Sequence, residues 1–158
     1  MRIVKSLLVA CIGVTALLYA LQNLANIDDM RAQMGRVLAG AEQGGSPDAF
    51  FYSNSPVLSW AAFGFVVLFQ FVIAAVAFKG AWDLFAARKG TAEEFRQAKT
   101  VAVWAGGLSL LSWFALFFLT GGGLFQWGSA SGQFALTKAF ELGTTSALTI
   151  LFVWGTTD

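Results

Sequence analysis

Few side chains in this sequence could take part in chemistry, and those that could lie within or beside long apolar stretches. Gln70 is the strongly polar side chain at the middle of the uncharged stretch 49–78. An amide at this position can hydrogen-bond either a ligand or a neighbouring helix. We expect the bond between helices, which is worth on the order of 1 kcal/mol in a membrane.

Lys138 and Glu141 form a second candidate, because residues three apart share one face of a helix and can pair. We expect a structural ion pair at the membrane interface, with a partner subunit or a lipid phosphate as the alternative contact. Trp127 follows a run of glycines, and tryptophan is enriched at membrane surfaces. Gln70, Trp127, Lys138 and Glu141 are therefore the candidate contacts to a partner or to lipid.

Several kinds of site are excluded by what the sequence lacks. It has no histidine, which excludes imidazole ligation of haem and the usual transition-metal sites. Cys11 is the single cysteine, and one thiol forms no internal disulfide and no structural zinc site. The glycine-rich segment after Thr120 lacks the G-x-x-x-x-G-K-[ST] pattern of a phosphate-binding loop. We expect no catalytic residue, no metal site and no cofactor, and the net charge of +1 gives no basis for nucleic-acid binding.

Leu8-Val9-Ala10-Cys11 resembles a lipoprotein processing site, but we expect the segment to be retained as a helix. Only the residues between Lys5 and Cys11 would form the apolar region of a signal peptide, which is shorter than about 7–15 residues. The apolar run also continues past Cys11 to Leu21.

Long uncharged stretches must position these side chains, and they predict a membrane protein. Hydrophobic residues make up 57% of the chain and charged residues only 12%, about half the share in soluble domains. A bilayer core is crossed by about 20 apolar residues of helix. The charge-free stretches are residues 6–27, 49–78, 100–137 and 142–157. The predicted fold is all-α and polytopic, with four transmembrane helices in a bundle.

We expect residues 1–158 to form a single four-helix transmembrane domain. The predicted helices cover about residues 3–24, 56–89, 92–120 and 133–155. Ser55 with Pro56 is typical of a helix start, and Thr91 with Glu94 forms a predicted capping box. The glycines from Gly121 onward predict a tight turn after the third helix.

The sequence pattern of the first loop on the outer side predicts a short amphipathic helix there. Met30, Met34 and Val37 recur at helical spacing, while charged residues occupy the other faces. Such a helix can lie on the membrane surface or pack over the mouth of the bundle, and the sequence leaves both open.

Basic residues predict the orientation. They are concentrated on one side, at the start of the first helix and around the connection between the second and third. These residues are Arg2, Lys5, Lys79, Arg88, Lys89, Arg96 and Lys99. The opposite loops hold only Arg31, Arg36 and Lys138. By the positive-inside rule, we expect both termini in the cytoplasm and the protein in the bacterial inner membrane.

With these features in place, the chain resembles a family of bacterial small integral membrane proteins, domain-of-unknown-function family 2165 (DUF2165). The likeness spans nearly the whole chain and depends on the order and spacing of several segments. These are the basic N-terminus, Gln22-Asn23-Leu24-Ala25-Asn26, Phe95-Arg96-Gln97-Ala98-Lys99, Trp113-Phe114, Gly121-Gly122 with Phe125 and Trp127, Gly132-Gln133 and Lys138. The family pattern has an acidic residue where this chain has Gly123. It often has another in the second helix, where the nearest polar residue of this chain is Gln70. The resemblance implies the fold and a membrane location, and no activity.

We expect a non-catalytic accessory or structural subunit of a larger membrane complex, of the respiratory, photosynthetic or transport kind. Its expected partners are membrane lipids and other membrane protein subunits. The alternative is a small transporter or channel acting as a homo-oligomer, which needs a polar pathway through Gln70, Ser109, Ser112 and the hydroxyl residues of the last helix. A membrane redox enzyme is the weakest class, since it would bind a quinone or pigment without histidine.

Overall fold

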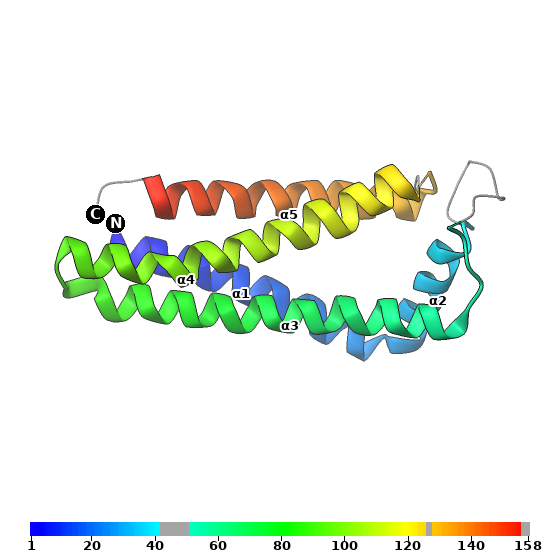
Figure 1. Cartoon of the computed structure of the whole chain (residues 1–158), viewed down its shortest axis with the longest axis horizontal. Helices are drawn as coiled ribbons and strands as arrows, with labels where there is room; N and C mark the ends of the chain where they lie inside the picture. The colour runs from blue at the N-terminus through cyan, green and yellow to red at the C-terminus, as the bar shows by residue number, and fades with distance from the viewer. Residues whose placement is uncertain (42–50, 126–127, 156–158) are drawn as a thin grey trace.

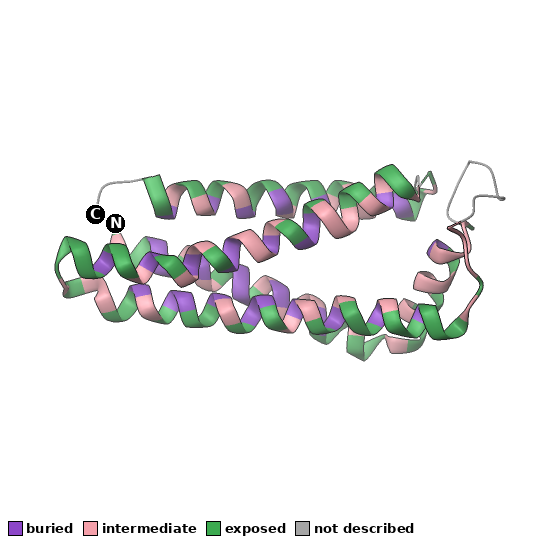
Figure 2. Ribbon diagram, viewed as in Figure 1, coloured by how far each residue is buried: buried purple, intermediate pink, exposed green. Residues whose placement is uncertain are grey.

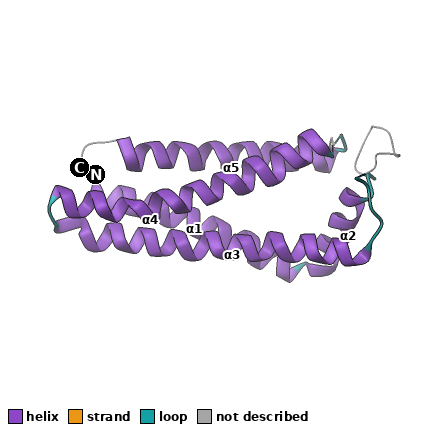
Figure 3. Ribbon diagram, viewed as in Figure 1, coloured by secondary structure: helices purple, strands orange, loops and turns teal. Residues whose placement is uncertain are grey.

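The computed structural model describes residues 1–41, 51–125 and 128–155, and within these ranges it contains helices and no strands (Figures 1 and 3). The elements are α1 (Arg2–Ala25), α2 (Ile27–Leu38), α3 (Pro56–Ala86), the 3₁₀ turn η1 (Ala87–Lys89), α4 (Ala92–Leu110), the π-helical segment η2 (Leu111–Leu124) and α5 (Ala130–Gly155). Four helices, α1, α3 with η1, α4 with η2, and α5, are long and apolar enough to cross a membrane. The predicted all-α, polytopic fold is confirmed.

The starts of the second and third spans follow the capping patterns in the sequence. Oγ of Ser55 accepts a hydrogen bond from the backbone N–H of Leu58, and Pro56 begins α3. Oγ1 of Thr91 accepts from the N–H of Glu94, while the Glu94 carboxylate accepts from the N–H of Thr91 at 2.7 Å. This capping box satisfies backbone donors that the first turn of α4 leaves unpaired.

The expected tight turn at Gly121 is wrong, because the third span continues as a helix to Leu124. Its last part is a π-helix, and the N–H of Phe125 donates to the carbonyl of Thr120 at 2.7 Å. Hydrocarbon offers no partners to backbone groups, so a helix without a proline keeps its internal hydrogen bonds even through glycines. Trp127 lies outside the described residues.

The fourth span begins at Ala130, a few residues before the predicted start. Oγ of Ser129 accepts a hydrogen bond from the N–H of Gly132 at 3.0 Å, which extends the helix toward its N-terminus.

The core lies between α1, α3 and α4, where small residues let the backbones approach (Figure 2). A Cβ placed on Gly80 would lie 2.7 Å from the backbone Cα of Ala102, so α3 and α4 touch there. A Cβ on Gly13 would lie 3.2 Å from that of Ala77, so α1 also packs closely on α3. Close packing of small residues is the main source of helix association in lipid.

The amphipathic helix is present as α2, and it packs over the end of the bundle. Asn26 separates α1 from α2, which turns across the end opposite the start of α1 (Figure 1). Val37 is buried, and α2 contacts α3. Of the two arrangements left open by the sequence, the structure has the helix over the bundle mouth.

We predict that Gly80→Ala destabilises the protein by about 1–3 kcal/mol, because the added methyl meets backbone that has no rotamer to change. The measurement is thermal unfolding in mild detergent followed by size-exclusion chromatography. Gly64→Ala on the same helix is the matched control, since a Cβ there meets nothing within 4 Å. Equal melting temperatures for the two variants would contradict the close α3–α4 contact.

Candidate functional site

A cavity of about 320 Å³ lies beneath α2, between four other elements of the bundle. Its lining residues are Tyr19, Asn23, Met30, Gln33, Met34, Val37, Phe63, Val66, Gln70, Trp113, Phe117, Phe134, Ala135 and Lys138. They come from α1, α2, α3, η2 and α5, so the cavity depends on the whole bundle. Binding sites for small molecules are commonly of this kind, mostly apolar with a few placed polar groups.

The polar part of the cavity is a pair of amides. Nδ2 of Asn23 on α1 donates a hydrogen bond to Oε1 of Gln70 on α3, at 2.9 Å. Gln70 is only 2% exposed. The bond between helices that the sequence suggested for Gln70 is therefore present, and its partner is Asn23.

This pair leaves hydrogen-bonding capacity unused. An amide has an NH2 donor and a carbonyl acceptor, and one bond between two amides uses one of each. Among the described residues, nothing accepts from Nε2 of Gln70 and nothing donates to Oδ1 of Asn23. The amino group of Gln70 and the carbonyl oxygen of Asn23 are therefore left to bind other groups at the polar part of the cavity.

Aromatic rings form much of the wall. Tyr19 and Trp113 meet edge to face with centroids 5.0 Å apart, and Trp113 lies 5.3 Å from Phe117 on the same helix. Met30 and Met34 of α2 complete the wall. Thioether and aromatic side chains together give an adaptable apolar surface.

Lys138 and Glu141 form the ion pair predicted by the sequence, with Nζ 2.6 Å from Oε2. Lys138 also lines the cavity and lies 5.7 Å from the centre of the Phe134 ring, while Glu141 lies outside the cavity lining. The side chains are 41% and 52% exposed on the surface of α5. Gln70 and Lys138 are thus brought to one cavity; whether Lys138 and Glu141 contact a partner or lipid stays a prediction.

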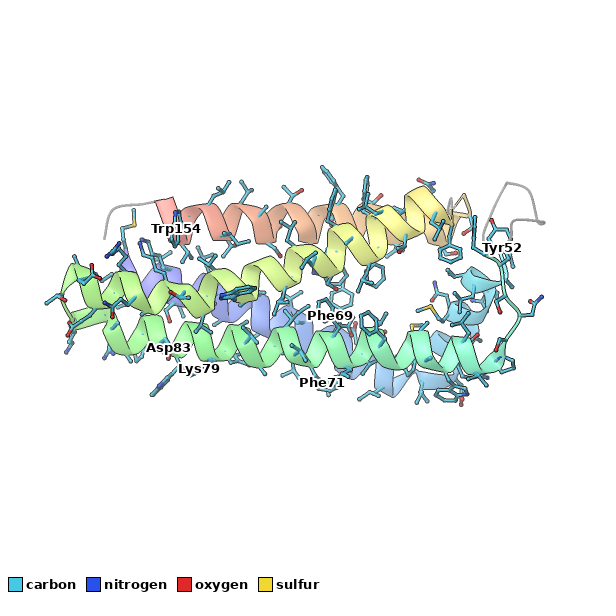
Figure 4. All side chains as sticks on the ribbon, in the orientation of Figure 1. Tyr52, Phe69, Phe71, Lys79, Asp83 and Trp154 are labelled. Carbon is cyan, nitrogen blue, oxygen red and sulfur yellow. The ribbon has the colours of Figure 1, made fainter. Side chains whose placement is uncertain are left out.

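An aromatic cluster closes the same end of the bundle. Gly40 has a positive φ of 75°, and a Cβ there would lie 2.9 Å from the ring of Tyr52. Tyr52 lies at this end of the bundle (Figure 4), and its ring stacks on that of Phe125 at 6.3 Å. Tyr52 therefore joins the end of α2 to the end of the third span.

At the other end of the bundle, two of the lysines that the sequence analysis counted for the orientation are buried. Lys5 is fully buried and Lys99 is 4% exposed, and their Nζ atoms lie 5.7 and 5.8 Å from the centre of the buried Phe95 ring. The guanidinium of Arg2 lies 4.8 Å from the same ring and donates to the carbonyl of Gly90 at 2.6 Å. The helical spacing of the sequence could have indicated the burial of Lys5, because Lys5 lies four residues before Val9 on the buried face of α1.

Comparison with protein families matches residues 1–155 to the family described as predicted small integral membrane protein (DUF2165). The chain belongs to the DUF2165 family. No curated protein and no solved structure matches it. The family description and the apolar helices together make this DUF2165 protein an integral membrane protein.

For this DUF2165 protein, we predict that Asn23 and Gln70 are energetically coupled by about 0.6 kcal/mol, the average for polar pairs in membrane helices. The measurement is a double-mutant cycle of Asn23→Ala and Gln70→Ala, with unfolding by denaturing detergent. The same cycle with Gln33→Ala in place of Asn23→Ala is the control, because Gln33 lines the cavity and makes no bond to Gln70. Additive effects of Asn23→Ala and Gln70→Ala would contradict the bond.

Proposed function

We propose that the protein is a non-catalytic accessory subunit of a larger membrane complex and that α5 is the helix that binds the partner. The observation that carries this proposal is an apolar groove of about 270 Å³ along α5, between this helix and the third span. Its base is formed by the small residues Ala139 and Gly143, which are buried and let α5 approach the third span closely. Its rim is exposed, and this rim is what a partner helix would contact.

The walls of this groove favour a helix as its occupant. Phe114 and Phe118 stack on η2, and Phe118 faces Phe140 on α5 with centroids 6.4 Å apart. Leu148 and Thr144 are exposed along the same groove. A partner helix would bury these exposed side chains, which lie above the already buried Ala139 and Gly143.

The position of α5 in the bundle supports the same proposal. It packs against α4 and η2, and the main core lies between α1, α3 and α4. Much of its surface is therefore directed away from the core (Figure 2). The Lys138–Glu141 ion pair is exposed there, and a partner would replace lipid next to these charges.

The proposal of a non-catalytic role is supported by the small number of side chains that could act as an acid or a base. The sequence has no histidine for acid–base chemistry near neutral pH. The ionisable pair near the cavity, Lys138 with Glu141, is already neutralised by its own contact.

We further propose a bacterial inner-membrane location with both termini in the cytoplasm. The start of α1 and the end of α5 at Gly155 lie at the same end of the bundle (Figure 1). That end carries the basic residues of the α3–α4 connection, and Lys79 pairs with Asp83 on the outer face of α3 nearby (Figure 4). The positive-inside rule assigns such an end to the cytoplasm.

We predict that Thr144→Phe lowers recovery of the partner at least tenfold when the tagged protein is isolated from its own membranes in mild detergent. The new ring would fill the groove without entering the core, since Thr144 is exposed. Quantitative mass spectrometry of the co-purified proteins measures the effect. Leu151→Phe is the matched control, because Leu151 is exposed on α5 and lies outside the groove.

A monodisperse monomer with no stoichiometric partner would count against the accessory role. Recovery of only a second, differently tagged copy of the chain would favour the alternative, a transporter or channel acting as a homo-oligomer.

For the orientation, we predict that a membrane-impermeant maleimide labels Asn54→Cys in spheroplasts and labels Ala92→Cys only after the membrane is opened. Both substitutions are made with Cys11→Ser, at exposed positions at opposite ends of the bundle. Gel-shift of the labelled protein measures the reaction. The reverse pattern would place the termini outside.

A further inference from the structure

We propose that the cavity beneath α2 binds a small uncharged molecule whose flat conjugated ring carries a carbonyl group. The proposal goes beyond the accessory role, and it concerns residues of this chain alone. Its starting point is the buried side chain of Gln70, whose carbonyl oxygen accepts a hydrogen bond while its amino group has no acceptor among the described residues.

Gln70 supplies the donor. The side chain is 2% exposed, its Oε1 is occupied by Asn23, and no described residue accepts from its Nε2. Gln70 lines the cavity, and its Nε2 is not among the fully enclosed unpaired atoms of the described residues, so a ligand in the cavity can reach it. A ligand carbonyl at the cavity would accept this hydrogen bond, and Oδ1 of Asn23 would accept one from a hydroxyl or N–H of the ligand.

The walls select a flat, apolar body. Rings from all four spans line the cavity, among them Tyr19 on α1, Phe63 on α3 and Trp113 on η2. Such rings stack well on a conjugated ring, whereas a flexible acyl chain gains less from them. The volume of about 320 Å³ lies at the lower end of the range for small-molecule sites, so the cavity holds one compact ring system.

The charges of the cavity require a neutral molecule. Lys138 is the charged side chain in the lining, and its ammonium group is already paired with Glu141 at 2.6 Å. The two amides carry no net charge. An ionised ligand would leave a charge at low dielectric without a free counter-ion, which costs far more than a neutral carbonyl.

The shape of the third span adds an independent observation. Trp113 and Phe117 reach the cavity from the π-helical segment η2. π-helical geometry is rare, and it changes the directions in which side chains project from a helix. Here the irregular segment places two rings in the wall of the cavity.

The test uses the purified full chain in lipid nanodiscs, with 2,3-dimethyl-1,4-naphthoquinone as the probe. This compound has two ring carbonyls, no charge, and no free ring position at which the Cys11 thiol can add. The comparison compound is 2,3-dimethylnaphthalene, which has the same ring and no carbonyl. Binding is measured by ultrafiltration, with the uptake of empty nanodiscs subtracted.

We expect saturable binding of the quinone at one site and at least tenfold weaker binding of the hydrocarbon. Gln70→Leu keeps the side-chain volume and removes the donor, so it should weaken quinone binding at least tenfold and leave hydrocarbon binding unchanged. Ala135→Trp should abolish binding by filling the cavity, whereas Leu151→Trp on the outer face of α5 should not change it.

Three results would overturn the proposal. They are equal affinity for the two ring compounds, no saturable binding beyond empty nanodiscs, and quinone affinity unaltered by Ala135→Trp. The comparison of the two compounds uses the unaltered protein, so it holds even where a variant fails to fold.

Discussion

The fold depends on one constraint, that hydrocarbon provides no hydrogen-bond partner, so every polar group in a span must find one inside the protein. Oγ of Ser6 donates to the carbonyl of Ala81 across the α1–α3 contact at 2.6 Å. Ser109 and Ser146 join α4 to α5 through their hydroxyls at 2.8 Å. Exposed hydroxyls, such as that of Thr145, donate to a carbonyl one turn earlier in their own helix. Polar side chains therefore connect the helices at defined points, and apolar packing fills the space between them.

Close packing of small residues makes these polar contacts possible. Gly80 against Ala102 and Gly13 against Ala77 bring three backbones together, so short side chains such as Ser6 can reach a neighbouring helix. The core is consequently built from α1, α3 and α4, and α5 is added along one side. A helix added in this way keeps a broad face toward lipid or a partner.

Much of this arrangement could be predicted from the sequence, because length, apolarity and caps act locally. Ser55, Pro56 and the Thr91–Glu94 box mark helix starts whatever the rest of the chain does. The path of the third span through Gly121 could not be read in the same way. Glycine indicates a turn in water, but in lipid the loss of internal hydrogen bonds outweighs its flexibility. The site was also only partly visible, since Asn23 and Gln70 meet through tertiary packing and Trp127 lies outside the described residues.

At the cavity this constraint is incompletely met, because Nε2 of Gln70 and Oδ1 of Asn23 have no partner among the described residues. An apolar protein that needed only stability could have two leucines in place of Asn23 and Gln70 and lose a bond worth on the order of 1 kcal/mol. The amide pair instead retains an unused donor and acceptor beside aromatic walls. The α5 residues that line this cavity end at Lys138, and the groove for a partner begins at Ala139. The ligand and the partner would therefore contact successive segments of α5. Loss of the ligand would remove no contact to the partner, and loss of the partner would remove no contact to the ligand.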